Sequence, residues 1–528
     1  MAEKPDYIVV GSGLAALSFS ALAARQGRKV VMLETHEHAG GFGHTFSFGT
    51  APRQYTFNAQ LHYVWNCGPG QTVDSFLRKL GLRDTVTFEH YDVKGYDRMR
   101  MPGHSLDIPN DWQLLKQRLA ELFPASADSC VGFLDDVKGL EEQLGEFAQA
   151  KGWPARLRQL PRLGLALRYR TATLQQAFDR HRLPLEAQTL LALQWPDFML
   201  PPRDLSFIAY TMLFAGYMRG AYYPNRHFEY IIDQLVHLIR SHDGQVRLQH
   251  RVIEFLREGD RVVGVRAEEV DASGRPTGPT HELRGEQVIC GMDPRQAATL
   301  IGPESFKRGV RKRLDYDYSV SNFMAYCAVE GIDLRDYGFG RSNLFHSEGV
   351  DLNATFDDMV IRGNYRQPSF AMTVPSLLTQ DHSDCPPGSQ IVELLTAADY
   401  RRFLHLKISD PRHYRAKKRE VFDSMLDVIE REYVPKFREH ICFKQLGSPT
   451  TNERYVHAPS GNSYGSNMTP ANVGLARLNH ETSIPGFHFC SASAGFAGFA
   501  GTIWTGCHLY EVLENDTVLS GPHTVAQQ

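Results

Sequence analysis

Short apolar runs and one longer Ala- and Leu-rich run open the chain, and their order predicts the first elements. Residues 7–10 are apolar and β-branched, as expected for a buried parallel strand. Residues 14–26 are rich in Ala and Leu and predict a helix, and residues 29–33 predict a second apolar strand. Strand, helix and strand in this order form a βαβ unit, whose two strands lie parallel in one sheet.

Glycines fill the turn between the first strand and the helix. Gly11 permits a tight turn, and Gly13 lets the backbone approach a pyrophosphate at the helix N-terminus. Ala16 is small enough for close packing of helix and strand. Glu34 ends the second strand, where its carboxylate can accept hydrogen bonds from ribose hydroxyls and disfavours a 2′-phosphate. The pattern predicts an adenine dinucleotide site, with a structural glycine turn as the alternative.

A second glycine-rich turn follows the acid directly. Residues 39–45 read Ala-Gly-Gly-Phe-Gly-His-Thr and resemble a loop of the FAD-containing amine oxidase and phytoene desaturase superfamily. In that superfamily the loop runs beside the pyrophosphate and leads towards the flavin. The alternative is a flexible surface turn. The nearby His36 and His38 have no acidic neighbours at ligand spacing, so we predict no metal site.

Residues 57–64, Phe-Asn-Ala-Gln-Leu-His-Tyr-Val, resemble another segment of this superfamily. The pair His62 and Tyr63 is most similar to the retinol saturase and carotenoid isomerase branch. The resemblance implies a position on the substrate side of the flavin and makes both residues catalytic candidates, since an imidazole can move a proton near neutral pH. Asn58 and Gln60 depart from the acid and the glycine usual there. The alternative for His62 is a hydrogen-bonded core residue.

Two later segments extend the resemblance. Residues 249–253 match the strand whose valine, here Val252, contacts adenine through its backbone. The strand over residues 486–490 leads to Ser491, where the family has a Gly-Asp pair, and then to a helix from about Thr502. The cofactor contacts that sequence and resemblance imply are Gly11, Gly13, Leu14, Ala15, Ala16, Glu34, Gly40, Gly41, His44, Thr45, Val252, Ser491, Ala492, Ser493, Gly501 and Thr502.

These segments span nearly the whole chain in the family's order, which defines the expected architecture. The fold class is α/β, with a split Rossmann-type FAD-binding domain and an inserted α+β substrate domain. The FAD-binding domain is expected over residues 1–75, 225–300 and 455–528. The substrate-binding, membrane-facing region is expected over residues 76–224 and 301–454.

The composition of the chain limits which kinds of partner and which cell compartment we expect. The chain has 528 residues with 57 basic and 60 acidic side chains, a net charge of −3, which argues against nucleic acid. Mean hydropathy is −0.34, and no long uncharged, strongly apolar run predicts a spanning helix. Eight scattered cysteines without a CxxC pair argue against a disulfide framework or zinc site. We expect a cytoplasmic protein, since no apolar signal region opens the sequence.

Residues 151–182 combine eight basic residues with one acid. Leu163, Leu167, Leu174 and Phe178 would share one face of a helix. A basic amphipathic helix is typical of membrane-surface elements, whereas the alternative is a solvated face over a core stripe. Aromatic residues cluster further along the chain, and they could line an apolar substrate channel or form part of the core. The members of this cluster are Trp195, Phe198, Phe207, Tyr210, Phe214, Tyr217, Tyr222 and Tyr223.

The resemblance implies an FAD-dependent oxidoreductase acting on carbon–carbon double bonds of a hydrophobic polyene or isoprenoid. Desaturation, saturation and cis–trans isomerisation share this machinery. No second strand–GxGxxG–helix unit indicates a separate NAD(P)H site. Alternatives are a fatty-acid double-bond isomerase or amine oxidase of the same fold, or a non-catalytic FAD-fold lipid carrier, which the missing Gly-Asp acid favours.

Overall fold

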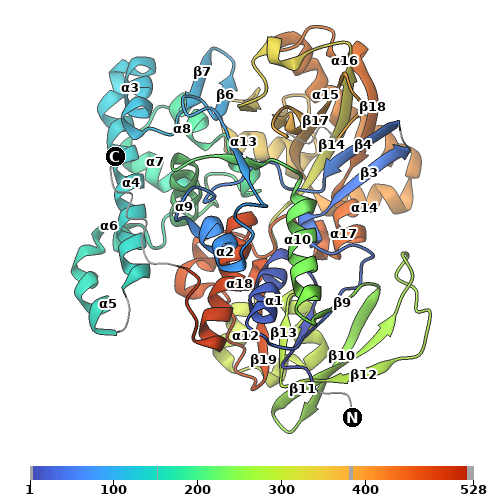
Figure 1. Ribbon diagram of the computed structural model, residues 1–528. Coiled ribbons are helices and arrows are strands. Elements are labelled where there is room, and N and C mark those ends of the chain that lie inside the picture. Colours follow the sequence, from blue (N-terminus) through green and yellow to red (C-terminus); the bar gives the residue numbers. More distant parts are fainter. Residues whose placement is uncertain (1–3, 51, 151–152, 380–383, 520–528) are drawn as a thin grey trace.

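A computed structural model describes residues 4–50, 52–150, 153–379 and 384–519. Figure 1 shows two stacked parts. A parallel sheet and the helices packed on it form the lower part. A larger mixed sheet and most of the remaining helices form the upper part.

The parallel sheet has the strand order β19-β13-β1-β2-β9. Apart from the partly exposed Gln287 of β13, its central strands are apolar and buried on both faces, as expected for a covered parallel sheet. Segments far apart in the sequence supply the strands, which are β19 (Phe487–Phe489), β13 (Gln287–Cys290), β1 (Tyr7–Val10), β2 (Val30–Leu33) and β9 (Gln245–Arg247).

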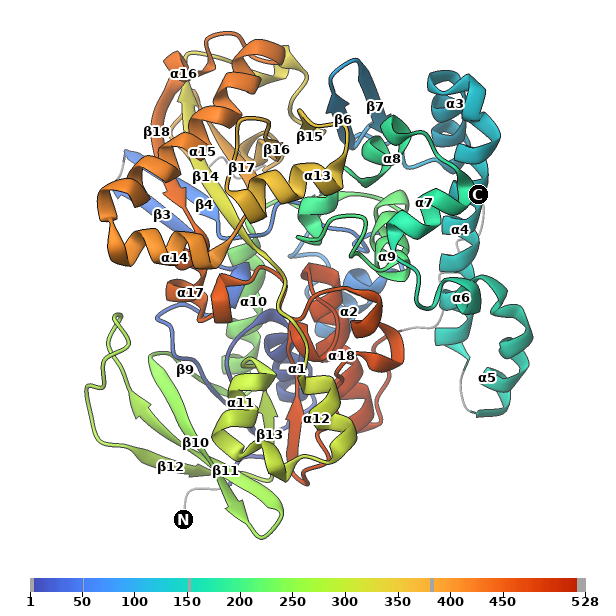
Figure 2. The same cartoon turned by 180° about the vertical axis from the view of Figure 1, so that it is seen from behind.

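Alternating residues of β1 bury their side chains in two different cores. Tyr7 and Val9 pack with helix α1 (Leu14–Arg25), which α10 (Phe228–Ser241) and α18 (Phe499–Glu514) flank. Ile8 and Val10 pack on the opposite face. That face is covered by an antiparallel sheet, seen from behind in Figure 2, which consists of β10 (His250–Glu258), β11 (Arg261–Glu269) and β12 (His281–Arg284). Because side chains alternate along a strand, one short apolar run serves both layers.

A glycine permits the closest helix contact in this part. A Cβ on Gly506 of α18 would lie 2.3 Å from the carbonyl oxygen of Ala15 and 2.8 Å from Cβ of Ser18, both on α1. Only a residue without a side chain therefore allows the two helices to approach this closely. The contact joins the first helix of the chain to the last helix described.

The upper part contains a seven-stranded sheet of order β18-β14-β17-β16-β15-β6-β7. Only β15 and β6 pair in parallel. The combination with the Rossmann-like lower part confirms the α/β class with an inserted α+β region. The strands are β18 (Ile441–Gly447), β14 (Ser321–Glu330), β17 (Ser389–Ala398), β16 (Ser369–Thr373), β15 (Asn343–Ser347), β6 (Asp97–Met101) and β7 (His104–Ile108).

Two short antiparallel pairs and the remaining α-helices also belong to the described chain. The pairs are β3 (Thr45–Thr50) with β4 (Arg53–Asn58), and β5 (Phe88–His90) with β8 (Tyr222–Pro224). The helices are α2 (Thr72–Leu80), α3 (Trp112–Leu122), α4 (Ala127–Gln149), α5 (Trp153–Gln159), α6 (Gly164–Tyr169), α7 (Leu174–His181), α8 (Leu185–Ala192), α9 (Phe207–Met218), α11 (Pro294–Ile301), α12 (Arg308–Leu314), α13 (Leu352–Phe356), α14 (Tyr400–Ser409), α15 (Pro411–Glu432), α16 (Phe437–His440) and α17 (Pro449–Val456).

The single amphipathic helix expected over residues 151–182 is wrong. The stretch forms α5, α6 and α7, while residues 151–152 lie outside the described residues. Pro161 and Gly164 disfavour a continuous helix, and Thr173 caps a new one through a capping box with Gln176.

The aromatic cluster forms core. Seven of its eight side chains are buried, and only Tyr222 is partly exposed. None of the eight lines the large cavity described below. In the part of the chain that the structure describes, no helix combines the length and the apolar character needed to cross a bilayer.

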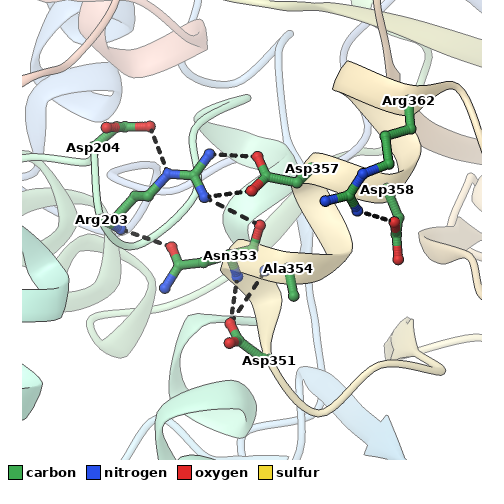
Figure 3. A network of polar contacts seen from close by, with 8 residues as sticks. All are labelled: Arg203, Asp204, Asp351, Asn353, Ala354, Asp357, Asp358 and Arg362. Carbon is green, nitrogen blue, oxygen red and sulfur yellow. Dashed lines mark hydrogen bonds and ion pairs between the residues drawn. The ribbon is translucent and has the colours of Figure 1, made fainter.

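An arginine joins the segment before α9 to α13, as Figure 3 shows. The Arg203 guanidinium donates to both carboxylate oxygens of Asp357, at 2.9 and 2.6 Å. Its backbone N–H donates to the Asn353 side chain at 3.0 Å, and Asp351 caps the start of α13. A bidentate pair fixes the relative orientation of the guanidinium and the carboxylate as well as the distance between them. It therefore sets how the segment before α9 meets the segment that begins with α13.

Candidate functional site

A cavity of about 670 Å³ lies at the carboxyl ends of the parallel strands. Ligands of open α/β sheets bind at this edge. The predicted cofactor residues that line it are Gly11, Gly13, Leu14, Ala15, Glu34, Gly40, Gly41, His44, Val252, Ser491, Ala492, Ser493 and Thr502. The other three predicted contacts lie behind this wall: Ala16, Thr45 and Gly501.

The first glycine turn fits a bound anion. Gly11 has φ +84°, and a Cβ there would lie 3.3 Å from the carbonyl carbon of Gly291. A Cβ on Gly13 would meet no atom within 4 Å, so the backbone is directly accessible from the cavity. No side chain caps the N-terminus of α1, which leaves its first N–H groups for a ligand. Ala16 faces Gly291 on the far side of the turn. A Cβ on Gly291 would lie 2.8 Å from the Cβ of Ala16.

Glu34 is held rigidly at the end of β2. Its Oε2 accepts hydrogen bonds from the Ser12 backbone N–H at 2.7 Å and the Ser12 hydroxyl at 2.6 Å. Its Oε1 accepts a bond from the His36 backbone N–H at 2.8 Å. Each carboxylate oxygen has more than one lone-pair site, so capacity remains for ribose hydroxyls. The sequence alone did not identify Ser12 as the residue that orients this acid.

A β-bulge follows Val252. In the β10–β11 pair, Val252 lies opposite Ala267 but Glu254 lies opposite Arg266, so Ile253 is the extra residue. A bulge leaves local backbone groups without ladder partners. Val252 borders the cavity at this point, which fits recognition of an adenine edge by main-chain groups.

The second glycine-rich turn closes over the first. The Gly40 N–H donates to the carbonyl oxygen of Ser12 at 3.0 Å, and a Cβ on Gly41 would lie 3.5 Å from Cα of Gly13. His44 lines the cavity, and burial lowers the pKa of its imidazole, which is therefore neutral at pH 7. Thr45 lies behind the turn and donates to Glu229 of α10.

The segment after β19 forms the opposite wall. The Ser491 hydroxyl is buried without a protein partner, as expected for a group that contacts a ligand. The Ser493 hydroxyl is engaged, because the Ser466 N–H donates to it at 3.0 Å. Helix α18 begins at Phe499, three residues before the predicted start, and no side chain caps it. Its free N–H groups and positive dipole end border the cavity beside Thr502.

A buried arginine supports this wall. Arg477 is 6% exposed, and its guanidinium donates to backbone carbonyl oxygens alone, including those of Ala492 at 2.9 Å and Asn472 at 3.3 Å. Burial lowers the pKa of Arg477 to about 10, so the group stays charged at pH 7. Sequence analysis missed this residue. Its charge adds positive potential to a wall that already contains a helix N-terminus.

Sequence analysis also left two lining segments without a site role. Residues 455–465 contribute Tyr455 and Tyr464, and Asp293 follows β13. Asp293 accepts hydrogen bonds from the hydroxyls of Tyr318 at 2.7 Å and Tyr316 at 3.2 Å. Residues 460–465, Ser-Gly-Asn-Ser-Tyr-Gly, resemble a segment of the same superfamily, and this resemblance is the signal that could have found the wall.

His62 lies just outside the cavity lining, which includes its neighbours Gln60 and Leu61. Its Nδ1 is 3.0 Å from Oε2 of Glu393, a buried carboxylate on β17. Glu393 also accepts a hydrogen bond from the Asn58 backbone N–H at 3.0 Å. The His62 Nε2 is buried and has no partner. A histidine held through Nδ1 with a free Nε2 has the arrangement of a proton-transfer group.

Tyr63 points away from the cavity. Its ring stacks on Tyr217 with centroids 4.3 Å apart, and its hydroxyl lies 3.0 Å from both Asp97 and Asp197. Burial raises the pKa of the Tyr63 phenol well above its usual value. The structure thus places the two catalytic candidates in different polar networks.

Sequence comparison identifies relatives among polyene-modifying proteins. The model of the NAD(P)-binding Rossmann-like domain matches residues 9–80. All-trans-retinol 13,14-reductase of Danio rerio is 21% identical over 95% of this chain and 84% of that protein. Chloroplastic prolycopene isomerase of Arabidopsis thaliana is 26% identical over 26% of this chain and 22% of its own length.

Structure comparison supports the same fold. A putrescine oxidase variant, solved in a redesign of cofactor binding, covers 97% of this chain and 99% of its own, with TM-score 0.64 and 12% identity. Its similarity extends over both parts of the molecule. Together these findings confirm that the chain resembles the family of phytoene desaturases, carotenoid cis–trans isomerases and retinol saturases within the amine oxidase-type flavoproteins.

Proposed function

We propose that this protein is an FAD-dependent oxidoreductase or isomerase that acts on carbon–carbon double bonds of a hydrophobic polyene or isoprenoid. The observation that carries the proposal is the cavity at the sheet edge, with Gly13 and Glu34 on one wall and Ser491 on the opposite wall. Relatives named for retinol reduction and prolycopene isomerisation supply the substrate class.

The cavity offers a donor or acceptor for each part of FAD. Glu34 would accept hydrogen bonds from the adenosine ribose, and the bulge at Val252 would meet adenine. The N–H groups at the start of α1, beside Gly13, would hold the pyrophosphate. Ser491 and the N-terminus of α18 would face the flavin half. Bound flavin supplies exchange of a hydride with the substrate.

Hydride exchange at an alkene leaves charge on the neighbouring carbon, so a proton must move as well. His62 is the residue that we assign to this task. Glu393 holds its Nδ1 and thereby leaves Nε2 to accept or donate a proton. Glu393 is itself fixed by the Asn58 N–H, so the imidazole has a defined orientation before substrate arrives.

Replacing Glu34 by Ala should weaken FAD binding by about tenfold to a hundredfold. The reason is the loss of a charge-assisted hydrogen bond to ribose, typically worth about 1.5–3 kcal/mol. Flavin content after purification and equilibrium titration of the apoprotein with FAD measure the effect. Glu37→Ala, at an exposed site three residues on, should bind as wild type. Equal flavin content in both variants would remove Glu34 from the site.

The activity itself is tested with purified, flavin-loaded protein and a panel of retinoids and carotenoids. Each substrate is offered with a chemical electron donor, with an electron acceptor, and with neither. Mass spectrometry distinguishes the outcomes, since saturation adds two hydrogens, desaturation removes two and isomerisation leaves the mass unchanged. Turnover of an amine in place of every polyene would favour the amine oxidase alternative.

His62→Gln should lower turnover by about 10²–10⁴-fold at unchanged flavin content, the usual contribution of a proton-transfer group. Glutamine keeps a polar side chain of similar size but cannot exchange a proton at pH 7. Gln60→Asn, a conservative change at a lining residue nearby, is the matched control and should retain most activity. If His62→Gln lowers turnover only a few fold, His62 has a structural role and is not the proton-transfer group.

We also propose that the α5–α6 surface contacts anionic membrane. Leu157, Leu160 and Leu167 are exposed by 42%, 47% and 56%. Basic side chains, among them Arg158 and Arg162, surround them. Exposed leucines among arginines provide an apolar contact together with attraction to acidic headgroups.

Reversing Arg158 and Arg162 to Glu should release the protein from liposomes that contain phosphatidylserine. Added salt should also weaken wild-type binding, since exposed charges are screened over about 8–10 Å at physiological ionic strength. Cosedimentation measures both effects. Arg311→Glu with Lys312→Glu makes the same change in net charge on exposed α12 and should not alter binding. Equal cosedimentation of both double variants would contradict the assignment of this surface.

A further inference from the structure

A pair of carboxyl groups shares one tyrosine inside the upper part. The Tyr63 hydroxyl oxygen lies 3.0 Å from Oδ2 of Asp97 and 3.0 Å from Oδ2 of Asp197. Asp97 begins β6, and Asp197 ends a short turn after α8. Three segments that are distant in sequence thus meet at one phenol.

The two carboxyl groups differ in their other partners. Asp97 accepts hydrogen bonds from the Gln194 amide at 2.6 Å and from the Asn343 amide at 3.0 Å. These donors, together with the Tyr63 hydroxyl, satisfy an ionised Asp97. Tyr63 carries a single hydrogen and cannot donate to both acids at once. Asp197 can complete its contact with Tyr63 only by donating a hydrogen of its own.

We infer that Asp197, Tyr63 and Asp97 form a proton-holding site, in which Asp197 carries a proton at neutral pH and donates it to Tyr63, which donates to ionised Asp97. The site rests on the contacts of these residues. The idea that the substrate reaction draws on the proton held at this site rests on the proposed function.

The electrostatic surroundings favour a shared proton over two negative charges. Burial raises the pKa of both Asp97 and Asp197, and the charge of Asp97 raises that of Asp197 further. The ionisable groups that face the pair from the packed elements are buried tyrosines whose own pKa values are raised: Tyr91, Tyr96, Tyr217 and Tyr464. Neutral phenols cannot compensate a second carboxylate, so one proton stays in the pair.

The pair lies outside the cavity lining, and Asp197 is the member in electrostatic contact with a lining residue. Asp97 has no exposed surface, whereas Asp197 retains part of its surface. The charge of Asp197 acts on the phenol of Tyr464, which lines the cavity. The protonated acid is therefore the accessible member, and the ionised acid lies behind it.

Infrared spectroscopy of the flavin-loaded protein tests the inference without substrate. The C=O stretch of a protonated carboxyl group lies above the amide and carboxylate bands. At pH 7 ordinary aspartates are ionised, so a protonated band reports a raised pKa. We expect one such band that moves to lower frequency when aspartate is ¹³C-labelled at its carboxyl group, which excludes flavin carbonyls. It should disappear as pH rises through about 8, the value to which burial and the charge of Asp97 raise the pKa of Asp197.

Variants assign the band. Asp197→Asn should abolish it, and Asp260→Asn, at a fully exposed aspartate, should leave it intact. Tyr63→Phe removes the hydrogen-bond acceptor and should move the band to higher frequency. Absence of a ¹³C-sensitive band in wild type, or its persistence in Asp197→Asn, overturns the inference. Because wild type alone gives the first readout, misfolding of a variant does not leave the question open. A band without polyene turnover would fault only the proposed function.

Discussion

Concentrated positive potential at one edge of the parallel sheet is the constraint on which the site depends. The uncapped N-termini of α1 and α18 converge on the cavity, and the charged Arg477 supports its far wall without a carboxylate partner. Buried charge without a counterion is costly. A bound dianionic pyrophosphate would offset this potential, so the architecture is arranged for an anion before any chemistry is considered.

The local part of this arrangement was predictable from the sequence. Residues 7–34 contain the strands, the helix, the glycine turn and the acid in a continuous segment, where spacing alone specifies geometry. Ser12 was not predictable, because its bond to Glu34 depends on how the turn folds back on β2. Arg477 was missed for the same reason, since its partners are backbone carbonyls that no sequence pattern marks.

The inserted part was less predictable, and its polar networks explain why. His62 and Glu393 are separated by 331 residues, and a histidine alone does not reveal the acid that orients it. Tyr63 follows His62 directly yet belongs to a different network, because adjacent side chains in an extended segment point to opposite sides. In residues 151–182 the apolar spacing predicts one helix, but Pro161, Gly164 and the capping residue Thr173 divide the stretch into separate helices.

The contact of Gly506 with α1 has a consequence for synthesis of the protein. Strand β19 and helix α18 complete the sheet edge and the α1 layer, yet they are synthesised after every other strand and α-helix that the structure describes. Until then, the buried face of α1 that receives α18 lacks its final partner. Long-range closure of this kind slows folding and prolongs exposure of apolar surface. Until α18 docks, the apolar face of α1 stays open to aggregation, and the cavity lacks the wall that α18 contributes.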